Sequence, residues 1–217
     1  MKKLLFLLIL LPLEVLAQRP VISFIGDSYV ANHRRPKTEA WHSLLAEELQ
    51  MDYQNVGRNG GCVAFDRTRD GFGPSMMVRY KQLDPKAEYV VIIAGHNDAV
   101  KIGHNRDSLQ MFSDSLDVLL NLIHQQCPRA RIGYVTPWYV DKSGFDPVCK
   151  TIRKVCRRHH VPVLYNHSPK CIIKVRDDDF RARYFQGKND TAHLNAEGHR
   201  LFLPVARKWF EKKLARK

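Results

Sequence analysis

Residues 24–29, Phe-Ile-Gly-Asp-Ser-Tyr, close a short apolar run that starts at Val21 and determine how the rest of the chain is interpreted. The run is typical of a strand that is buried on both faces of a parallel sheet. Gly26 and Asp27 end it, and Ser28 follows at once. Because α/β sheets bind ligands beyond the carboxyl ends of their strands, Ser28 is a candidate nucleophile. Asp27 and Ser28 are also favoured helix caps, so this stretch alone leaves a purely structural interpretation open.

The rest of the chain alternates between strand and helix patterns. The run Tyr89-Val90-Val91-Ile92-Ile93 is the clearest buried strand, and residues 108–126 carry apolar side chains at helical spacing. Strands separated by helices in this order imply a parallel sheet with helices on both faces. We therefore predict one α/β domain, a three-layer α/β/α sandwich with a five-stranded parallel sheet. The expected strands lie near 21–25, 51–56, 88–94, 130–136 and 161–165, and the expected helices near 38–49, 76–82, 108–126, 146–159 and 196–214.

The first 17 residues have the anatomy of a secretory signal peptide. Lys2 and Lys3 form a positive start, residues 4–13 are apolar, and residues 15–17 occupy the usual cleavage positions. The apolar run is too short to span a bilayer comfortably, although an uncleaved membrane anchor is the alternative. We predict export to a periplasm or out of the cell after cleavage near Ala17, no transmembrane anchor, and a mature single domain of residues 18–217.

The chain is strongly basic, with 35 Lys and Arg residues against 22 Asp and Glu residues. Such a balance favours anionic partners: an anionic glycan, an anionic lipid surface or nucleic acid. The basic residues are dense only in 153–158 and 207–217, and both segments look like solvated helix faces. No zinc-finger or RNA-binding signature accompanies them, so we predict no specific nucleic-acid partner.

The five cysteines of an exported chain can form at most two disulfides, with one thiol left over. Cys149 and Cys156 lie on one predicted helix, about 10.5 Å apart along its axis. That separation is too large for a mutual disulfide, whose Cα atoms are about 5.5–6 Å apart. Burial as small apolar side chains is an equally good account of the cysteines, so any pairing stays open.

Two further polar stretches follow predicted strands. Residues 55–61, Asn-Val-Gly-Arg-Asn-Gly-Gly, contain glycines that allow a backbone N–H to point into a cleft. Residues 95–98, Gly-His-Asn-Asp, place an Asn amide where it can donate to a developing oxyanion. Each stretch alone also fits an ordinary turn. Together they provide hydrogen-bond donors at the same sheet edge as Ser28.

A fourth stretch, Asp190-x-x-His193, precedes the last predicted helix. The spacing puts both side chains on one side of a turn or helix. Asp190 can then accept a hydrogen bond from one imidazole nitrogen, and the other nitrogen can take a proton from Ser28. The alternatives are a helix cap with a surface histidine, or a metal site formed with His199. The metal set lacks a clear fourth ligand, so we predict no metal.

Taken in chain order, these stretches resemble the SGNH (GDSL-type) hydrolase family over essentially the whole mature chain. That family is marked by Gly-Asp-Ser near the start, a glycine loop, Gly-x-Asn-Asp, and Asp-x-x-His near the end. One departure is small: Leu194 follows the histidine where many members have proline. The matching blocks here are Gly26-Asp27-Ser28, Asn55-x-Gly57-x-x-Gly60, Gly95-His96-Asn97-Asp98 and Asp190-x-x-His193.

The resemblance implies a serine esterase with a flavodoxin-like sheet and no cofactor. By matching position, Ser28 would be the nucleophile and His193 the general acid and base, with Asp190 orienting His193. The oxyanion hole would consist of the Ser28 and Gly60 backbone N–H groups and the Asn97 amide. These assignments are implied by the family pattern.

Small exported members of that family are often similar to carbohydrate O-acetylesterases. The expected substrate is therefore an acylated carbohydrate or another small ester, most simply an acetyl ester. A lysophospholipase or short-chain lipid esterase is the alternative, and a non-catalytic glycan-binding module is an alternative of a different class. The candidate substrate-binding residues are Tyr29, His96 and Trp138. Other loop side chains that could join a sugar platform are His33, Arg34, Arg58, Phe72 and Tyr139.

Overall fold

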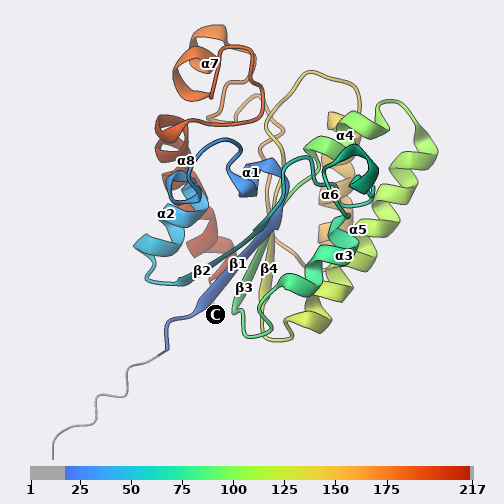
Figure 1. The fold of residues 1–217 in the computed structure, drawn as a ribbon, viewed down its shortest axis with the longest axis vertical. Coiled ribbons are helices and arrows are strands. Elements are labelled where there is room, and N and C mark those ends of the chain that lie inside the picture. The colour runs from blue at the N-terminus through green and yellow to red at the C-terminus, as the bar shows by residue number, and fades with distance from the viewer. Residues whose placement is uncertain (1–17, 216–217) are drawn as a thin grey trace, which may run out of the picture.

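The computed structural model describes residues 18–215 (Figure 1). The predicted signal peptide, residues 1–17, lies outside the described residues. One parallel sheet runs through the structure in the order β2-β1-β3-β4-β5, which confirms the predicted flavodoxin-like α/β fold. Its strands are β1 (Val21–Gly26), β2 (Asp52–Gly57), β3 (Tyr89–Ile93), β4 (Arg131–Val135) and β5 (Val163–Leu164).

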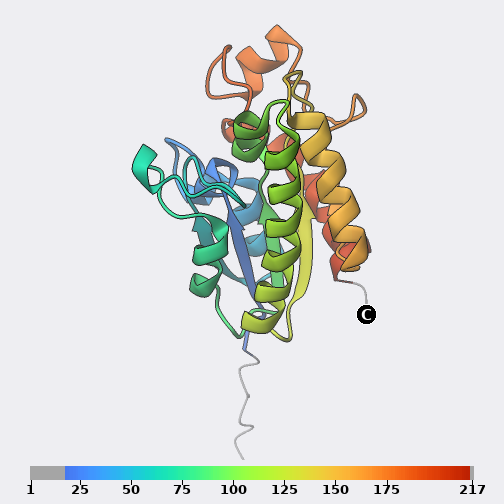
Figure 2. The same ribbon diagram turned by 90° about the vertical axis from the view of Figure 1, so that its right-hand side faces the viewer.

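Helices cover both faces of the sheet, as the three-layer prediction requires. Figures 1 and 2 show α2 and α8 on one side and α3, α5 and α6 on the other. The α-helices are α1 (Ser28–Ala31), α2 (Trp41–Glu48), α3 (Met76–Arg79), α4 (His96–Ile102), α5 (Arg106–Gln126), α6 (Phe145–Arg158), α7 (Asp178–Tyr184) and α8 (Ala196–Trp209). Short 3-10 turns cover Lys37–Glu39, Thr68–Asp70 and Tyr80–Gln82, and a π-helical turn, Phe210–Leu214, follows α8.

The central strand β1 places the first motif at a switch in topology. It pairs with β2 on one side and with β3 on the other, and Gly26 lies level with both Gly57 and Ile93. The connection after β1 leads to β2 on one side, and the connection after β2 crosses back to β3 on the other side of β1. In sheets of this kind the crevice for ligands opens beyond the strand ends at that point. Ser28 lies immediately above it.

A continuous apolar core holds the layers together. Phe24 of β1 is fully buried and meets the ring of Trp41 from α2 at 6.0 Å, nearly edge to face. Trp41 in turn packs against Phe202 of α8 with ring centroids 5.4 Å apart. Aromatic pairs of this geometry stabilise beyond the area they bury. The helices that flank the candidate site are therefore fixed to the strand that ends in it.

The structure differs from the predicted elements mainly at short segments. The helix expected over 38–49 is a 3-10 turn followed by α2, and β5 is only two residues long. Three short helices, α1, α4 and α7, were not predicted. Helices of four to seven residues provide too few turns for an apolar period to show in the sequence.

All five cysteines are buried free thiols, which agrees with the interpretation of these residues as small apolar side chains. Cys149 and Cys156 both lie on the buried face of α6. Among residues 18–215, no helix combines the length and the apolar character needed to cross a bilayer.

Candidate active site

Ser28 begins α1, a single helical turn directly after β1. Asp27 caps this turn, and its side chain accepts a hydrogen bond from the Tyr29 N–H at 2.9 Å. Gly26 is needed just before because a Cβ atom there would overlap the carbonyl oxygen of Ile93 on β3. The close approach of β1 and β3 therefore sets where Ser28 leaves the sheet.

Asp190 and His193 lie in the loop between α7 and α8. A bridge between Phe185 and Leu194 holds the loop, and Asn195 caps α8 by accepting a hydrogen bond from the Gly198 N–H. Within the loop, one Asp190 oxygen accepts hydrogen bonds from the backbone N–H groups of residues 192 and 193. The carboxylate is thus fixed by the backbone before it meets the histidine ring.

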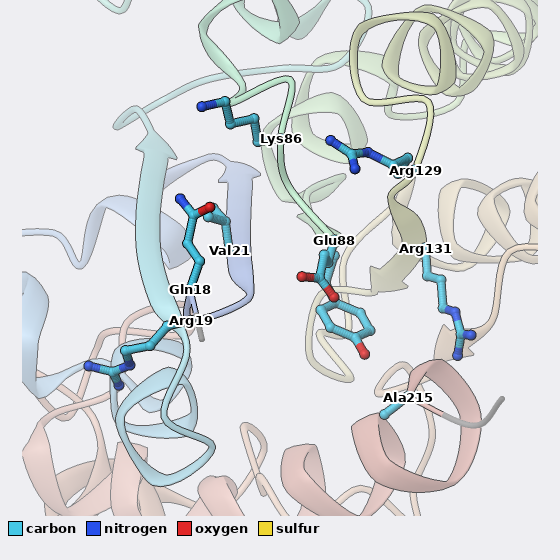
Figure 3. Close-up of a pocket in the computed structure, with 9 residues that line it drawn as sticks. Gln18, Arg19, Val21, Lys86, Glu88, Arg129, Arg131 and Ala215 are labelled. Atoms are coloured by element: carbon cyan, nitrogen blue, oxygen red, sulfur yellow. The ribbon is translucent and has the colours of Figure 1, made fainter. Parts of the chain in front are cut away.

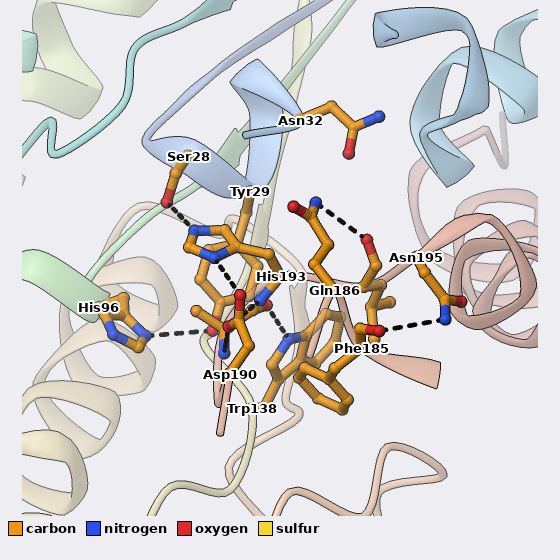
Figure 4. A network of polar contacts seen from close by, with 12 residues as sticks. Ser28, Tyr29, Asn32, His96, Trp138, Phe185, Gln186, Asp190, His193 and Asn195 are labelled. Carbon is orange, nitrogen blue, oxygen red and sulfur yellow. Dashed lines mark hydrogen bonds and ion pairs between the residues drawn. The ribbon is translucent and has the colours of Figure 1, made fainter. Parts of the chain in front are cut away.

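The structure brings Ser28, His193 and Asp190 into one hydrogen-bonded line (Figure 4). His193 Nε2 lies 2.8 Å from Ser28 Oγ, and His193 Nδ1 lies 2.9 Å from Asp190 Oδ2. Partial burial works to raise the pKa of Asp190, but hydrogen bonds from the His193 ring and the backbone outweigh it, and that pKa lies below its usual value. The carboxyl group is therefore ionised and acts as an acceptor for the imidazole.

Gly60 lies in the loop that follows β2, and Asn97 lies in the first turn of α4, which follows β3. Gly60 has a φ of 69°, and a Cβ atom there would overlap the ring of Phe72. The Asn97 amide donates one hydrogen bond to the Gly61 carbonyl at 3.1 Å. Within residues 18–215, neither the Ser28 N–H nor the Gly60 N–H donates to a protein acceptor. Both N–H groups are thus available to a ligand.

The last residue of the third motif, Asp98, holds the glycine loop in place. Its carboxyl oxygens accept hydrogen bonds from the N–H groups of Val63 and Ala64 at 3.0–3.1 Å. Complete burial raises the pKa of Asp98 to about 6, although these hydrogen bonds counteract the effect. Asp98 therefore ties the segment after Gly60 to the start of α4.

A family model described as the GDSL-like Lipase/Acylhydrolase family matches residues 24–201. The match includes all four motifs and spans most of the chain. The chain belongs to this family. No curated protein sequence matches the chain.

Several solved structures share the fold at low sequence identity. A protein from Lactobacillus plantarum aligns with a TM-score of 0.71 and 18% identity, over 89% of this chain and 97% of its own. A structure named as a GDSL-like lipase from Bacteroides uniformis gives a TM-score of 0.62 and 17% identity, over 89% and 95% of the two chains. A family two carbohydrate esterase from Clostridium thermocellum gives 0.64 and 14%, over 90% of this chain and 64% of its own.

Two predicted substrate contacts of this GDSL-like chain lie behind the serine and histidine. Trp138 is only 2% exposed, and its Nε1 donates to the Ala192 carbonyl at 2.9 Å. Tyr29 is 7% exposed and packs on Trp138 with ring centroids 5.3 Å apart. Both side chains are almost entirely covered by protein, so they pack behind the site and expose little ring surface for the predicted sugar contact. Trp138 supports the loop that holds His193.

His96, the third predicted contact, is half-buried next to Tyr29. The Tyr29 hydroxyl lies 3.2 Å from His96 Nδ1 (Figure 4). Burial, helped by the nearby His193, lowers the pKa of His96 to about 4. The ring is therefore neutral near pH 7, and it holds the tyrosine in place at the edge of the site.

His33 lies against His193 and belongs to none of the four motifs. Its ring packs against that of His193, with centroids 4.7 Å apart and planes tilted by 32°. Burial and the neighbouring His193 lower the pKa of His33. A neutral ring beside His193 limits its positions without adding a positive charge. The sequence predicted His33 only as one of the loop side chains that could join a sugar platform, and not as a neighbour of His193.

Arg79 is a buried cation beneath the site that the sequence did not reveal. It is 3% exposed, and it donates hydrogen bonds to the carbonyl oxygens of Val56 at 2.8 Å and Gly26 at 3.0 Å. Burial lowers its pKa to about 10, so the guanidinium stays charged near pH 7. Arg79 thereby joins the carboxyl ends of β1 and β2 directly below Ser28.

Asp27 is fully buried beside this arginine. One carboxyl oxygen accepts the Tyr29 N–H, and the other has no hydrogen-bond partner within the described residues. Burial raises the pKa of Asp27 to about 7, and the nearby negative charge of Asp98 contributes in the same direction. The motif aspartate is therefore structural, and it titrates close to neutral pH.

Asp27→Asn is expected to gain stability relative to the native chain as pH rises from about 4 to about 7. Over this window folded Asp27 keeps a proton that the unfolded chain, with the ordinary value of 3.8, has released. Native stability therefore falls as pH rises, by up to about tenfold in the unfolding equilibrium constant per pH unit. Asparagine stays neutral and removes this contribution. Urea unfolding of both proteins across this range measures it, and parallel pH profiles would contradict the assignment.

Proposed function

We propose that this protein is an exported serine esterase that hydrolyses small acyl esters, acetyl esters above all, on carbohydrate. The main support is the line from Ser28 Oγ to His193 at 2.8 Å and from His193 to Asp190 at 2.9 Å. A nucleophile, a base and an orienting carboxylate need this geometry. Export rests on the signal-peptide pattern of residues 1–17, and residues 18–217 are the proposed mature domain.

In the proposed reaction, the Ser28 hydroxyl gives its proton to His193 Nε2 as its oxygen attacks the ester carbonyl. The alcohol leaves with that proton, and the acyl group stays on Ser28 as an ester. Water then attacks the acyl-enzyme, and His193 takes a proton from the water and returns it to Ser28. Asp190 keeps a hydrogen on His193 Nδ1 and stabilises the charged ring. The products are an alcohol and a carboxylic acid.

We assign the oxyanion hole to the Ser28 and Gly60 N–H groups and the Asn97 amide. Such donors stabilise the negative oxygen of the tetrahedral intermediate more than the neutral carbonyl. The assignment is supported by the two N–H groups, which have no protein acceptor in the described part of the chain. The Asn97 amide has two hydrogens, and the Gly61 carbonyl uses one of them.

A small cavity behind the nucleophile favours a short acyl group. It has Ser28 and His193 on its wall and a volume of about 10 Å³, and Trp41, Trp138 and Leu194 close it. That volume matches roughly one water molecule. Gly60 and Asn97 do not line this cavity, so it does not continue the assigned oxyanion hole into a long channel. A lysophospholipase would need such an apolar channel, whereas an acetyl group would not.

Two observations favour carbohydrate as the alcohol part. The family two carbohydrate esterase from Clostridium thermocellum, which shares the fold, has been solved in complex with cellohexaose. In this chain Phe72 is 38% exposed and packs on Gly60, beside the assigned oxyanion hole. The Arg67 guanidinium lies over the Phe72 ring, 4.1 Å from its centroid. The Arg67–Phe72 pair thus combines hydrogen-bond donors with partly exposed apolar surface, and we assign it as the leading carbohydrate contact.

The proposal is tested with p-nitrophenyl acetate, butyrate and octanoate, and with acetate release from acetylated xylan. We expect kcat/KM to fall by about tenfold or more for each substantial lengthening of the acyl chain, because a pocket without room must rearrange. Acetylated xylan is expected to release acetate in the presence of a chelator. Lysophosphatidylcholine is the comparison substrate. A preference for octanoate or lysophosphatidylcholine would contradict the acetyl assignment and favour a lipid esterase.

A further inference from the structure

A groove lined by basic side chains lies on the flank of the molecule, beside the edge strand β5. It has a volume of about 600 Å³, and Val161, Pro162 and Val163 form its apolar wall. Figure 2 shows α6 and the end of α8 next to each other at this edge. We call it the basic groove and define it by its six basic side chains: Lys150, Arg153, Lys154, Arg157, His160 and Lys213.

The basic side chains form a row along α6. Lys150, Arg153, Lys154 and Arg157 follow the three- and four-residue spacing of one helix face. Their row is about 10 Å long, at about 1.5 Å of rise per residue. Lys213 enters from the π-helical turn after α8. Cations from two distant segments of the chain thus meet in one elongated groove.

Little negative charge balances this row. Lys150 pairs with Asp146 at 2.6 Å, and the Arg153 guanidinium lies over the Tyr165 ring, 4.7 Å from its centroid. Within residues 18–215, Lys154, Arg157 and Lys213 form no ion pair. No Asp or Glu lines the groove itself. These exposed cations are free to meet an anionic ligand.

A second hollow, at the amino ends of β1 and β3, differs in this respect (Figure 3). Glu88 lies among its basic residues, and Arg19 pairs with Asp52 at 3.9 Å. Its remaining cations are Lys86, Arg129 and Arg131. The two hollows therefore differ in that an acidic side chain lines the second hollow and none lines the basic groove.

We propose that the basic groove binds a polysaccharide that carries carboxylate groups, such as a uronic-acid polymer. The planar guanidinium groups of Arg153 and Arg157 match carboxylates, and the row can meet several charges of one chain. The wall of Val161, Pro162 and Val163 offers an apolar surface to the carbon faces of sugar rings. The groove shares no residue with the Ser28 site, so this binding does not depend on the proposed esterase activity.

Other polyanions fit less well. Single-stranded nucleic acid gains much of its affinity by stacking bases on aromatic rings, and no aromatic side chain lines the groove. A membrane surface would require apolar side chains that project from α6, but the apolar residues of this helix face the sheet. A bilayer is also too broad to enter a groove. These features leave a flexible anionic glycan as the ligand.

The test compares Lys154→Gln/Arg157→Gln with Lys86→Gln/Arg129→Gln, which loses the same charge at the second hollow. We expect the groove variant to bind polygalacturonate about tenfold more weakly and the control variant to bind like the native chain. Binding should weaken with added salt. Turnover of p-nitrophenyl acetate, recorded alongside, should be unchanged in both variants, and circular dichroism verifies folding.

Several outcomes would overturn the proposal. One is equal loss of binding in both variants, which would indicate net charge alone. Another is no binding of polygalacturonate by the native chain. The third is groove-dependent binding only of dextran sulfate, a DNA oligonucleotide or phosphatidylserine vesicles. Loss of esterase turnover without loss of polygalacturonate binding would count against the proposed function and leave the basic groove intact.

Discussion

Ser28→Ala is expected to lower kcat/KM for p-nitrophenyl acetate by about 10⁴–10⁶-fold, the range seen when a serine hydrolase loses its nucleophile. His193 lies 2.8 Å from the serine oxygen and has no other nucleophile to activate at that distance within the described residues. Without the hydroxyl no acyl-enzyme can form, and only oxyanion stabilisation and binding remain. Steady-state kinetics with p-nitrophenyl acetate measures the loss, and thermal unfolding shows whether the fold persists.

Ser143→Ala is the matched control, because Ser143 is an exposed serine in the loop before α6. It is expected to retain native turnover. Robust hydrolysis by the Ser28 variant would remove Ser28 from the mechanism. Absence of turnover in the native chain as well would favour a glycan-binding module on the same fold.

Asp190→Asn is expected to lower kcat by about 10⁴-fold with little change in KM, by analogy with the same replacement in other serine hydrolases. One Asp190 oxygen is held by the backbone N–H groups of residues 192 and 193, so an asparagine carbonyl would stay there. Its amide nitrogen would then face His193 Nδ1 as a donor. The imidazole would have to carry its hydrogen on Nε2, and in that tautomer it cannot accept the Ser28 proton.

The pattern of kinetic constants distinguishes this effect from general damage to the loop. A loop that has lost its shape would raise KM and lower the melting temperature as well as kcat. Asp179→Asn, an exposed carboxylate on the neighbouring α7, is the control and should behave like the native chain. Retention of kcat within about tenfold by the Asp190 variant would show that another group orients His193.

The fold could be predicted closely because its signals are local. The strand β1 is a buried apolar run followed by Gly-Asp-Ser, and the long amphipathic helices α5 and α6 show their period in the sequence. The polar motifs follow β1, β2 and β3, which are neighbours in the sheet. Parallel strands bring their carboxyl ends to one edge, so motifs far apart in sequence were expected to meet there.

The features that escaped prediction depend on long-range packing. Arg79 belongs to a stretch that looks like an ordinary surface helix, and only the pairing of β1 with β2 brings two carbonyl groups to its guanidinium. Trp138 looked like an exposed loop aromatic, but α8 and Ala192 cover it. His33 meets His193 across 160 residues of sequence. Local composition contains no information about such contacts.

The central claim, that Ser28 is a nucleophile activated by His193, is tested most directly by covalent labelling with diethyl p-nitrophenyl phosphate. Intact mass spectrometry should show one diethylphosphoryl group per chain, and peptide mapping should place it on Ser28. Labelling should be absent in Ser28→Ala and strongly slowed in His193→Ala. A label on another residue, or an unlabelled native chain that still hydrolyses p-nitrophenyl acetate, would contradict the claim.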